Sequence, residues 1–170
     1  MAAYQTIELA RIAPSPGDGK RIEVEVDPGG VELGGHLYSV KPGGIDGMLE
    51  VSRTASGYAL RLAFTAELTG PCVRCLADAR VPISVEAREV DQPGTDDEEL
   101  RSPYVNEGEL EIGAWAHDAL VLAMPLQLLC RPDCAGLCPV CGESLNDADA
   151  AAHDHPREPD PRWAKLRELG

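Results

Sequence analysis

The residues with the clearest capacity for chemistry in this chain are cysteines, which occur at the spacing of metal ligands. Cys72 and Cys75 form one Cys-x2-Cys pair, and Cys138 and Cys141 form another, which Gly142 follows directly. In a turn of this kind both thiolates can reach one tetrahedral ion, and the glycine lets the backbone turn where a side chain would clash. Two such pairs in a chain with six cysteines predict a bound metal ion.

The alternatives to zinc are disulfides, unpaired core thiols and an iron–sulfur cluster. Disulfides suit secreted domains, but the first residues lack the basic stretch and apolar run of a secretory signal, so we expect a reducing cytoplasm. Core thiols would be scattered, whereas four cysteines fall within the twelve residues Cys130–Cys141. The segment Cys134-x3-Cys138-x2-Cys141 matches a radical-SAM cluster, but Val140 replaces the usual aromatic residue and too little chain follows for a large barrel. The spacing therefore favours zinc.

Two histidines raise the number of candidate donors to eight, enough for two tetrahedral sites. One partition joins the first Cys-x2-Cys pair to Cys130 and Cys134, and leaves the second pair with His153 and His155 as a Cys2His2 site. The rival partition uses the four cysteines of residues 130–141 for one compact site and a single zinc ion. The histidines equally suit a solvent-exposed tail. The candidate ligands are Cys72, Cys75, Cys130, Cys134, Cys138, Cys141, His153 and His155.

Catalysis by zinc is not expected, because closed sites consume every donor and no unused base stands out. We therefore expect a protein that is not an enzyme and has no small-molecule substrate. The preferred partition predicts two zinc ions with a structural role, and the rival predicts one.

The overall charge limits the class of partner. Fifteen basic and twenty-nine acidic residues give a net charge of −14, which argues against binding nucleic acid through bulk electrostatics. An acidic surface more commonly serves solubility. No apolar run approaches the ~20 residues of a transmembrane helix, so no membrane association is expected.

Hydrophobic alternation predicts a sheet. The clearest runs are separated by a loop carrying Cys72 and Cys75, so they predict an antiparallel hairpin with both thiols at its tip. Seventeen glycines and fourteen prolines predict many turns. The expected strands are Ile22–Val26, Met48–Val51, Tyr58–Leu68, Val81–Val85 and Glu109–Ile112.

Other segments are expected to be helical or irregular. Residues 114–124 predict a helix with Trp115, Ala119, Leu122 and Ala123 near one face, ended by Pro125. Residues 91–102 predict a solvated acidic loop. Residues 160–169 predict a short helix capped by an aspartate and begun by a proline.

These elements predict an α+β fold of mostly short antiparallel strands, one or two short helices and a cysteine-rich zinc knuckle segment near the C-terminus. We expect one domain in three parts. Residues 1–44 are turn-rich, residues 45–129 hold the β-hairpin core and a helix, and residues 130–170 hold the knuckle segment and a C-terminal helix.

Direct RNA contact would fall on the basic residues near the hairpin tip, Arg61, Arg74, Arg80 and Arg131. The net charge favours a different role, in which these arginines offset neighbouring carboxylates or thiolates.

Three motifs taken together resemble the YceD family, proteins named for accumulation of large-subunit ribosomal RNA, over about residues 45–169. The motifs are Cys72-Val-Arg-Cys75-Leu after an alternating strand, Cys130-x3-Cys134-Ala-Gly-Leu-Cys-Pro-Val-Cys-Gly, and Asp160-Pro-Arg-Trp-Ala-Lys-Leu. The resemblance implies a cytoplasmic, non-enzymatic factor in 23S ribosomal RNA maintenance and large-subunit biogenesis. Some relatives look as if they carry Cys-x-Cys at the position of His153-Asp-His155, which supports these histidines as ligands.

Two functions follow as expectations. The first is a zinc-stabilised factor in 23S ribosomal RNA accumulation, whose partner is large-subunit RNA or a ribosomal protein. The alternative is an acidic adaptor that binds a ribosomal protein without contacting RNA. The sequence leaves open the direct partner, the assembly step and the oligomeric state.

Overall fold

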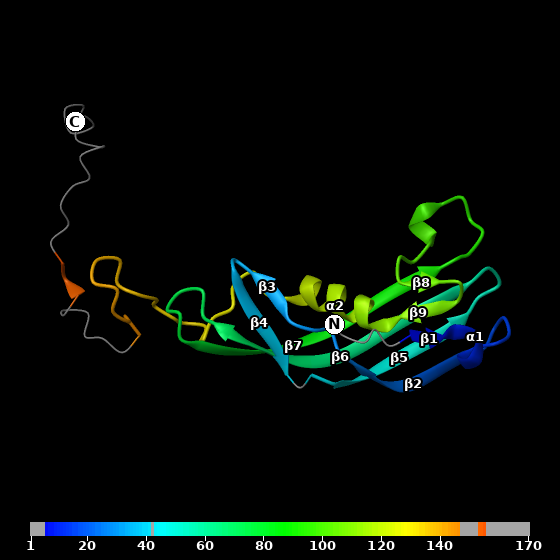
Figure 1. Cartoon of the computed structure of the whole chain (residues 1–170), viewed down its shortest axis with the longest axis horizontal. Coiled ribbons are helices and arrows are strands. Elements are labelled where there is room, and N and C mark those ends of the chain that lie inside the picture. The colour runs from blue at the N-terminus through cyan, green and yellow to red at the C-terminus, as the bar shows by residue number, and fades with distance from the viewer. Residues whose placement is uncertain (1–5, 42, 147–152, 156–170) are drawn as a thin grey trace, which may run out of the picture.

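The computed structural model describes residues 6–41, 43–146 and 153–155, and its central feature is one long hairpin. Strands β6 (Tyr58–Pro71) and β7 (Asp78–Asp91) pair in an unbroken antiparallel register of fourteen residues each. At ~3.4 Å per residue this ladder is about 45 Å long. The chain follows it along the long axis of the molecule (Figure 1).

Two bent strands complete the main sheet. Strands β2 (Gly19–Val26) and β3 (Val31–Leu33) follow one another along one path, and β4 (His36–Lys41) and β5 (Ile45–Arg53) follow one another along the next. The β5 strand pairs with β2 and with the start of β6, whereas β4 pairs with β3 and with the end of β6. The sheet is therefore a meander whose first two strands each bend at a glycine-rich corner, where a glycine tolerates the change of direction.

A small second sheet and a helix cover one face of the main sheet. Strand β1 (Thr6–Glu8) pairs with β9 (Glu109–Glu111), which pairs with β8 (Val105–Asn106). Helix α2 (Ile112–Ala123) begins directly after β9 and packs against β7. Two shorter turns, α1 (Leu9–Ile12) and the 3-10 turn η1 (Glu98–Leu100), complete the described elements.

The core lies between the main sheet and α2. On β6 the buried residues are Tyr58, Leu60, Leu62, Phe64, Ala66 and Leu68, so burial alternates strictly along the strand. Trp115 and Leu120 of α2 are at most 2% exposed on the opposite side of this core. Apolar residues that alternate on a strand and recur each turn on a helix bury one face of each element together.

The predicted antiparallel sheet and hairpin are confirmed, but the prediction of mostly short strands is wrong for the hairpin. The hydrophobic alternation ends at Leu68 and resumes at Val81, whereas the pairing of the two strands extends to Pro71 and Asp78. The turn-rich description of residues 1–44 missed β3 and β4, because both strands are short and glycines and prolines flank them. The helix expected over residues 160–169 lies outside the described residues.

The helix expected over residues 114–124 is α2, which starts two residues earlier. Trp115 and Ala119 face the core as expected, but the prediction is wrong for Leu122, which is 87% exposed, and for Ala123, which is also exposed. Residues 92–102 form the expected acidic loop, with η1 as a single turn inside it.

The end of the hairpin is braced by Tyr38 of β4. Its ring lies over Gly70, where an added Cβ would fall 2.7 Å from the ring atom Cε1, and its hydroxyl donates a 3.1 Å hydrogen bond to the Pro71 carbonyl. The tyrosine is 1% exposed. The absence of a side chain at Gly70 thus lets β4 hold the hairpin immediately before Cys72.

We expect Gly70→Ala to lower the free energy of unfolding by about 1–3 kcal/mol, because the added methyl overpacks the Tyr38 ring. Chemical denaturation measures the change. Gly43→Ala is the matched control, since nothing lies within 4 Å of a Cβ there. Equal denaturation midpoints for the two variants would contradict this account of the hairpin end.

Candidate metal centre

The first group of donors lies where the hairpin tip meets the segment after α2. It contains Cys72, Cys75, Cys130 and Cys134, whose sulfur atoms all lie within 4.8 Å of one another. The Cys72 and Cys134 sulfurs are 3.8 Å apart, and those of Cys75 and Cys130 are 3.5 Å apart. Four sulfurs bound at ~2.3 Å to a tetrahedral ion would be about 3.8 Å apart, so the group fits such an ion.

Backbone contacts hold the two halves of this group together. The Val73 N–H donates to the Leu128 carbonyl at 2.9 Å, and Arg74 donates from its guanidinium to the Cys134 carbonyl at 3.0 Å. Gly136, at φ +82°, fits against the Arg74 carbonyl, where a Cβ would come within 3.2 Å. The hairpin tip and the C-terminal segment are therefore in contact through protein atoms alone.

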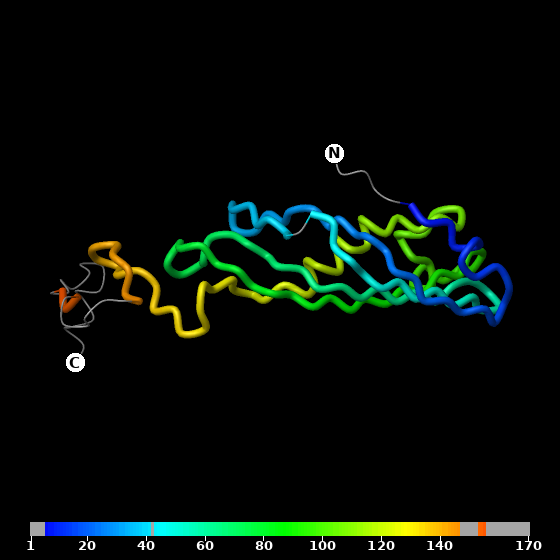
Figure 2. Tube along the Cα trace, turned by 90° about the horizontal axis from the view of Figure 1, so that it is seen from below, coloured from blue at the N-terminus to red at the C-terminus, as the bar shows by residue number. Residues whose placement is uncertain are grey.

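The second group lies farther along the C-terminal segment, beyond the hairpin tip (Figures 1 and 2). It contains Cys138, Cys141, His153 and His155, whose donor atoms also lie within 4.8 Å of one another. The Cys141 sulfur is 3.5 Å from His153 Nδ1. The Nε2 atom of His155 is buried and has no hydrogen-bond partner among the described residues, as suits a nitrogen that binds a metal ion.

The structure thus groups the eight donors as in the first partition. It does not form the compact set of four cysteines from residues 130–141. All six cysteines are free thiols.

The two Cys-x2-Cys pairs have the same backbone conformation, which the sequence analysis missed. In the first, the Cys72 N–H donates to the carbonyl five residues on at 2.8 Å, and the Leu76 N–H donates back to the Cys72 carbonyl at 2.9 Å. In the second, the Cys138 N–H donates to the Glu143 carbonyl at 2.7 Å, and the Gly142 N–H donates back to the Cys138 carbonyl at 2.9 Å. Leu76 at φ +61° and Gly142 at φ +76° follow the second cysteine of each pair. We call these two turns the knuckles.

The geometry also favours one thiolate in each group. Burial opposes ionisation of Cys72, but the N–H groups of Arg74 and its neighbours outweigh it and lower the pKa of this thiol to about 6. The N–H groups of Cys141 and Val140 lower the pKa of Cys138 to about 6. Contact with the Cys75 sulfur raises the pKa of Cys130 to about 12. Because a metal displaces thiol protons, each knuckle supplies a first ligand that is already deprotonated near neutral pH.

Asn146 is a supporting residue that no spacing pattern indicated. Its side chain accepts a 2.8 Å hydrogen bond from the Ala135 N–H and lies 3.6 Å from the Cys134 sulfur. Its carbonyl accepts a 2.7 Å bond from Arg131. Residues of this kind orient metal ligands, and they are found only once the fold brings them beside the ligand.

The arginines proposed for RNA contact have structural partners in most cases. Arg61 lies between Glu50 and Glu86, at 2.8 and 3.0 Å, and the hydrogen bond that it donates to Glu86 raises the pKa of the guanidinium. Arg74 and Arg131 hold the C-terminal segment through the bonds described above. Arg80 is exposed on β7.

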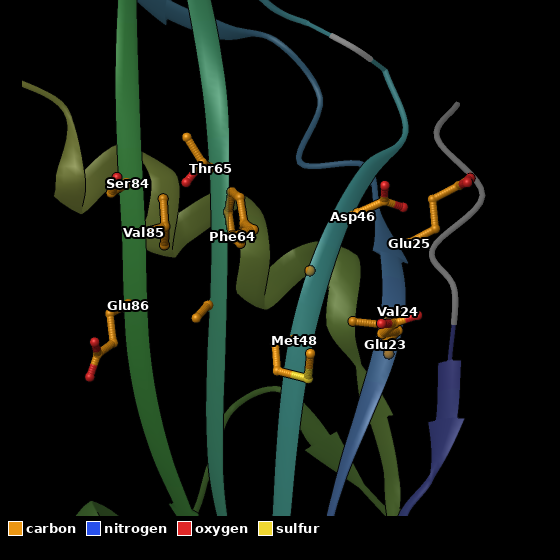
Figure 3. Close-up of a pocket in the computed structure, with 12 residues that line it drawn as sticks. Glu23, Val24, Glu25, Asp46, Met48, Phe64, Thr65, Ser84, Val85 and Glu86 are labelled. Atoms are coloured by element: carbon orange, nitrogen blue, oxygen red, sulfur yellow. The ribbon is translucent and has the colours of Figure 1, made fainter.

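The face of the main sheet opposite α2 is acidic where it is hollowed. A hollow of about 800 Å³ lies where β5 diverges from β6, and its lining includes Glu23, Glu25, Asp46 and Glu86 (Figure 3). Carboxylates repel phosphate groups, so this surface disfavours nucleic acid. Within the described part of the chain, no helix has the length and apolar character needed to cross a membrane.

Comparison with known proteins places these features in a family. Residues 60–170 match the family described as large ribosomal RNA subunit accumulation protein YceD. Uncharacterised proteins of Mycobacterium bovis and Mycobacterium tuberculosis are each 31% identical over 99% of this chain and 83% of their own length. An uncharacterised protein of Mycobacterium leprae is 32% identical over 62% of this chain and 49% of its length. No solved structure matches the chain.

The repeated knuckle geometry yields a pair of opposite predictions. Leu76→Gly should raise the free energy of unfolding by about 1 kcal/mol, because a leucine is strained at positive φ and this one is 61% exposed. Gly142→Ala should lower it by a similar amount, since no atom within 4 Å would obstruct the methyl and only backbone strain is added. Denaturation of the reduced, metal-loaded protein measures both. A loss of stability in Leu76→Gly would show that the leucine side chain matters more than the strain.

Proposed function

Because the chain belongs to the YceD family of large ribosomal RNA subunit accumulation proteins, we propose that it is a cytoplasmic, non-enzymatic factor that supports 23S ribosomal RNA accumulation. We propose further that it binds two zinc ions, one that joins the hairpin tip to the C-terminal segment and one held within that segment. The observation that carries this proposal is the presence of two four-donor groups at the end of a long sheet.

Zinc is the ion that the donors support best. The first group offers four sulfurs and the second offers two sulfurs with two imidazoles, and both sets suit tetrahedral zinc. Four protein ligands leave no open position for water or substrate, so each ion would have a structural role. The protein would then act by presenting a surface to a ribosomal partner.

A protein partner is favoured over RNA by the placement of the positive charges. Arg61 is neutralised between two carboxylates, while Arg74 and Arg131 are used within the C-terminal segment. The exposed hollow on the sheet is lined by acids. Ribosomal proteins are basic as a class because they bind RNA, so an acidic adaptor that contacts one of them is our second candidate.

The two-zinc proposal predicts unequal effects of removing a ligand. Cys75→Ser should lower the melting temperature about 2–4 °C more than Cys141→Ser. The first ion would close loops of 55 and 62 residues between its sulfurs. The longest loop that the second ion would close runs from Cys138 to His155 and is about one third as long. The entropy of loop closure then makes the first ion stabilise the folded state by about 1 kcal/mol more than the second.

Metal analysis of the purified, reduced protein is the accompanying measurement, and it should give two zinc ions per chain. One zinc per chain, lost in Cys141→Ser and retained in Cys75→Ser, would overturn this assignment in favour of the four cysteines of residues 130–141.

The proposed role predicts that depletion of the protein in its own host lowers the ratio of 23S to 16S ribosomal RNA. Expression of the wild-type chain should restore the ratio, and a Cys72→Ser, Cys134→Ser chain should fail to do so. Gly43→Ala is the matched chain expected to restore it. A ratio that stays constant on depletion under every growth condition would refute the role.

A further inference from the structure

Strand β7 is an open edge of the main sheet. Its only partner among residues 6–41 and 43–146 is β6. The Cys72 N–H donates to the Ala77 carbonyl, which makes these two residues a hydrogen-bonded pair of the ladder. Since bonded and non-bonded pairs alternate in an antiparallel ladder, Ser84, Glu86 and Arg88 fall in non-bonded pairs with β6. Their backbone N–H and C=O groups therefore point away from β6, toward the open edge.

Only one part of this edge is available for pairing. Pro82 is also in a non-bonded pair with β6, so its backbone nitrogen faces the open edge. Because a proline nitrogen carries no hydrogen, an added strand cannot continue its pairing past Pro82 toward the hairpin tip. At the other end the Gln92 N–H donates to the Leu100 carbonyl at 2.8 Å, which brings η1 against the end of β7. The free stretch therefore runs from Ser84 to Arg88.

A groove of about 300 Å³ lies beside this free stretch. One wall is residues 86–89 of β7, and the other is α2, through Trp115, Ala119, Leu122 and Ala123. Figure 3 shows β7 as the outermost strand, with α2 crossing behind the sheet and past its edge. Leu122 lines this groove and is 87% exposed, so nothing in the described part of the chain covers its apolar side chain. An apolar side chain beside unpaired backbone groups is what an added strand would cover.

We propose that β7 and α2 bind an extended, lysine- or arginine-rich segment of a partner protein, which adds to the sheet as a strand beside β7. Main-chain hydrogen bonds to Ser84, Glu86 and Arg88 would supply affinity. Alternate side chains of the added strand would lie over Ala119 and Leu122, so we expect those side chains of the partner to be apolar. That the partner is ribosomal rests on the proposed function, whereas the binding mode rests on the edge and groove alone.

The charge of the partner follows from the end of the groove. The exposed carboxylates of Asp96, Asp97, Glu98 and Glu99 lie in the loop that η1 holds against the end of β7. Arg88 beside the groove is already paired with Glu86 at 3.1 Å. A strand leaving the edge in this direction meets four acids, so a basic segment is favoured and an acidic one is opposed.

The test uses a synthetic peptide of about seven alternating lysine and valine residues, a length that matches the free stretch with one residue on each side. The full chain carries Trp163→Phe, which leaves Trp115 in the groove as the one tryptophan. We expect saturable binding reported by Trp115 fluorescence. Methylation of alternate backbone nitrogens in the peptide should weaken binding about tenfold or more, because it removes donors and leaves the charge unchanged.

Two protein variants locate the peptide. Leu122→Asp and Arg88→Pro should each weaken binding about tenfold, the first by placing a charge in the groove and the second by removing an outward N–H as Pro82 does. Leu126→Asp is the matched control, because Leu126 is 100% exposed and does not line this groove. Circular dichroism establishes that each variant is folded.

Equal binding by all three variants, no binding by the unmodified chain, or displacement of the peptide by an RNA oligonucleotide in direct competition for Trp115 would each overturn the inference. Restoration of the 23S to 16S ratio by Leu122→Asp in depleted cells would overturn the ribosomal identity of the partner while leaving the ribosomal RNA role intact. Failure of the wild-type chain to affect that ratio, with peptide binding retained, would instead refute the proposed function and leave the strand-binding groove.

Discussion

The backbone ladder between β6 and β7 is the interaction on which the other elements depend, because each of them is positioned against one of its two strands. Strands β4 and β5, the two halves of one bent strand, both pair with β6, while α2 packs across β7. The ladder also carries Cys72 and Cys75 at its tip, where the segment after α2 meets the hairpin. Fourteen paired residues on each strand make this support stiff enough to present two thiols at a fixed spacing, although the tip itself is a short turn.

Distance along the molecule separates two kinds of surface. The metal-ligand groups lie at and beyond the hairpin tip, whereas the open stretch of β7 lies in the half of the hairpin that α2 covers. Pro82 stands between them and prevents pairing on the tip side. The candidate metal groups and the proposed strand-binding edge are thus separated along the molecule, and a substitution in one need not disturb the other.

The hairpin and the candidate donors that gather in two groups could be predicted from sequence, because alternation and Cys-x2-Cys spacing are local patterns. Strand β4 could not, since only Tyr38 and Val40 alternate inward along its six residues and glycine pairs on both sides make the segment resemble a turn. Asn146 contributes through contacts with Ala135 and Cys134 that exist only in the folded chain. The positive φ of Leu76 could not be predicted for a different reason. Leu76 occupies the position that Gly142 occupies in the other knuckle, but a leucine does not indicate a positive φ.

The order of the ligands along the chain has a consequence for synthesis. Cys72 and Cys75 emerge from the ribosome 62 and 55 residues before their partners Cys134 and Cys130. At ~5–20 residues added per second, the hairpin tip waits about 3–12 s for the rest of its coordination shell. During that interval the nascent chain exposes a two-thiol turn, and the first group of donors is gathered only after residues 130–134 have been added. An ion held by all four sulfurs would therefore be captured late, and chains truncated before residue 130 would be left with an open pair of thiols.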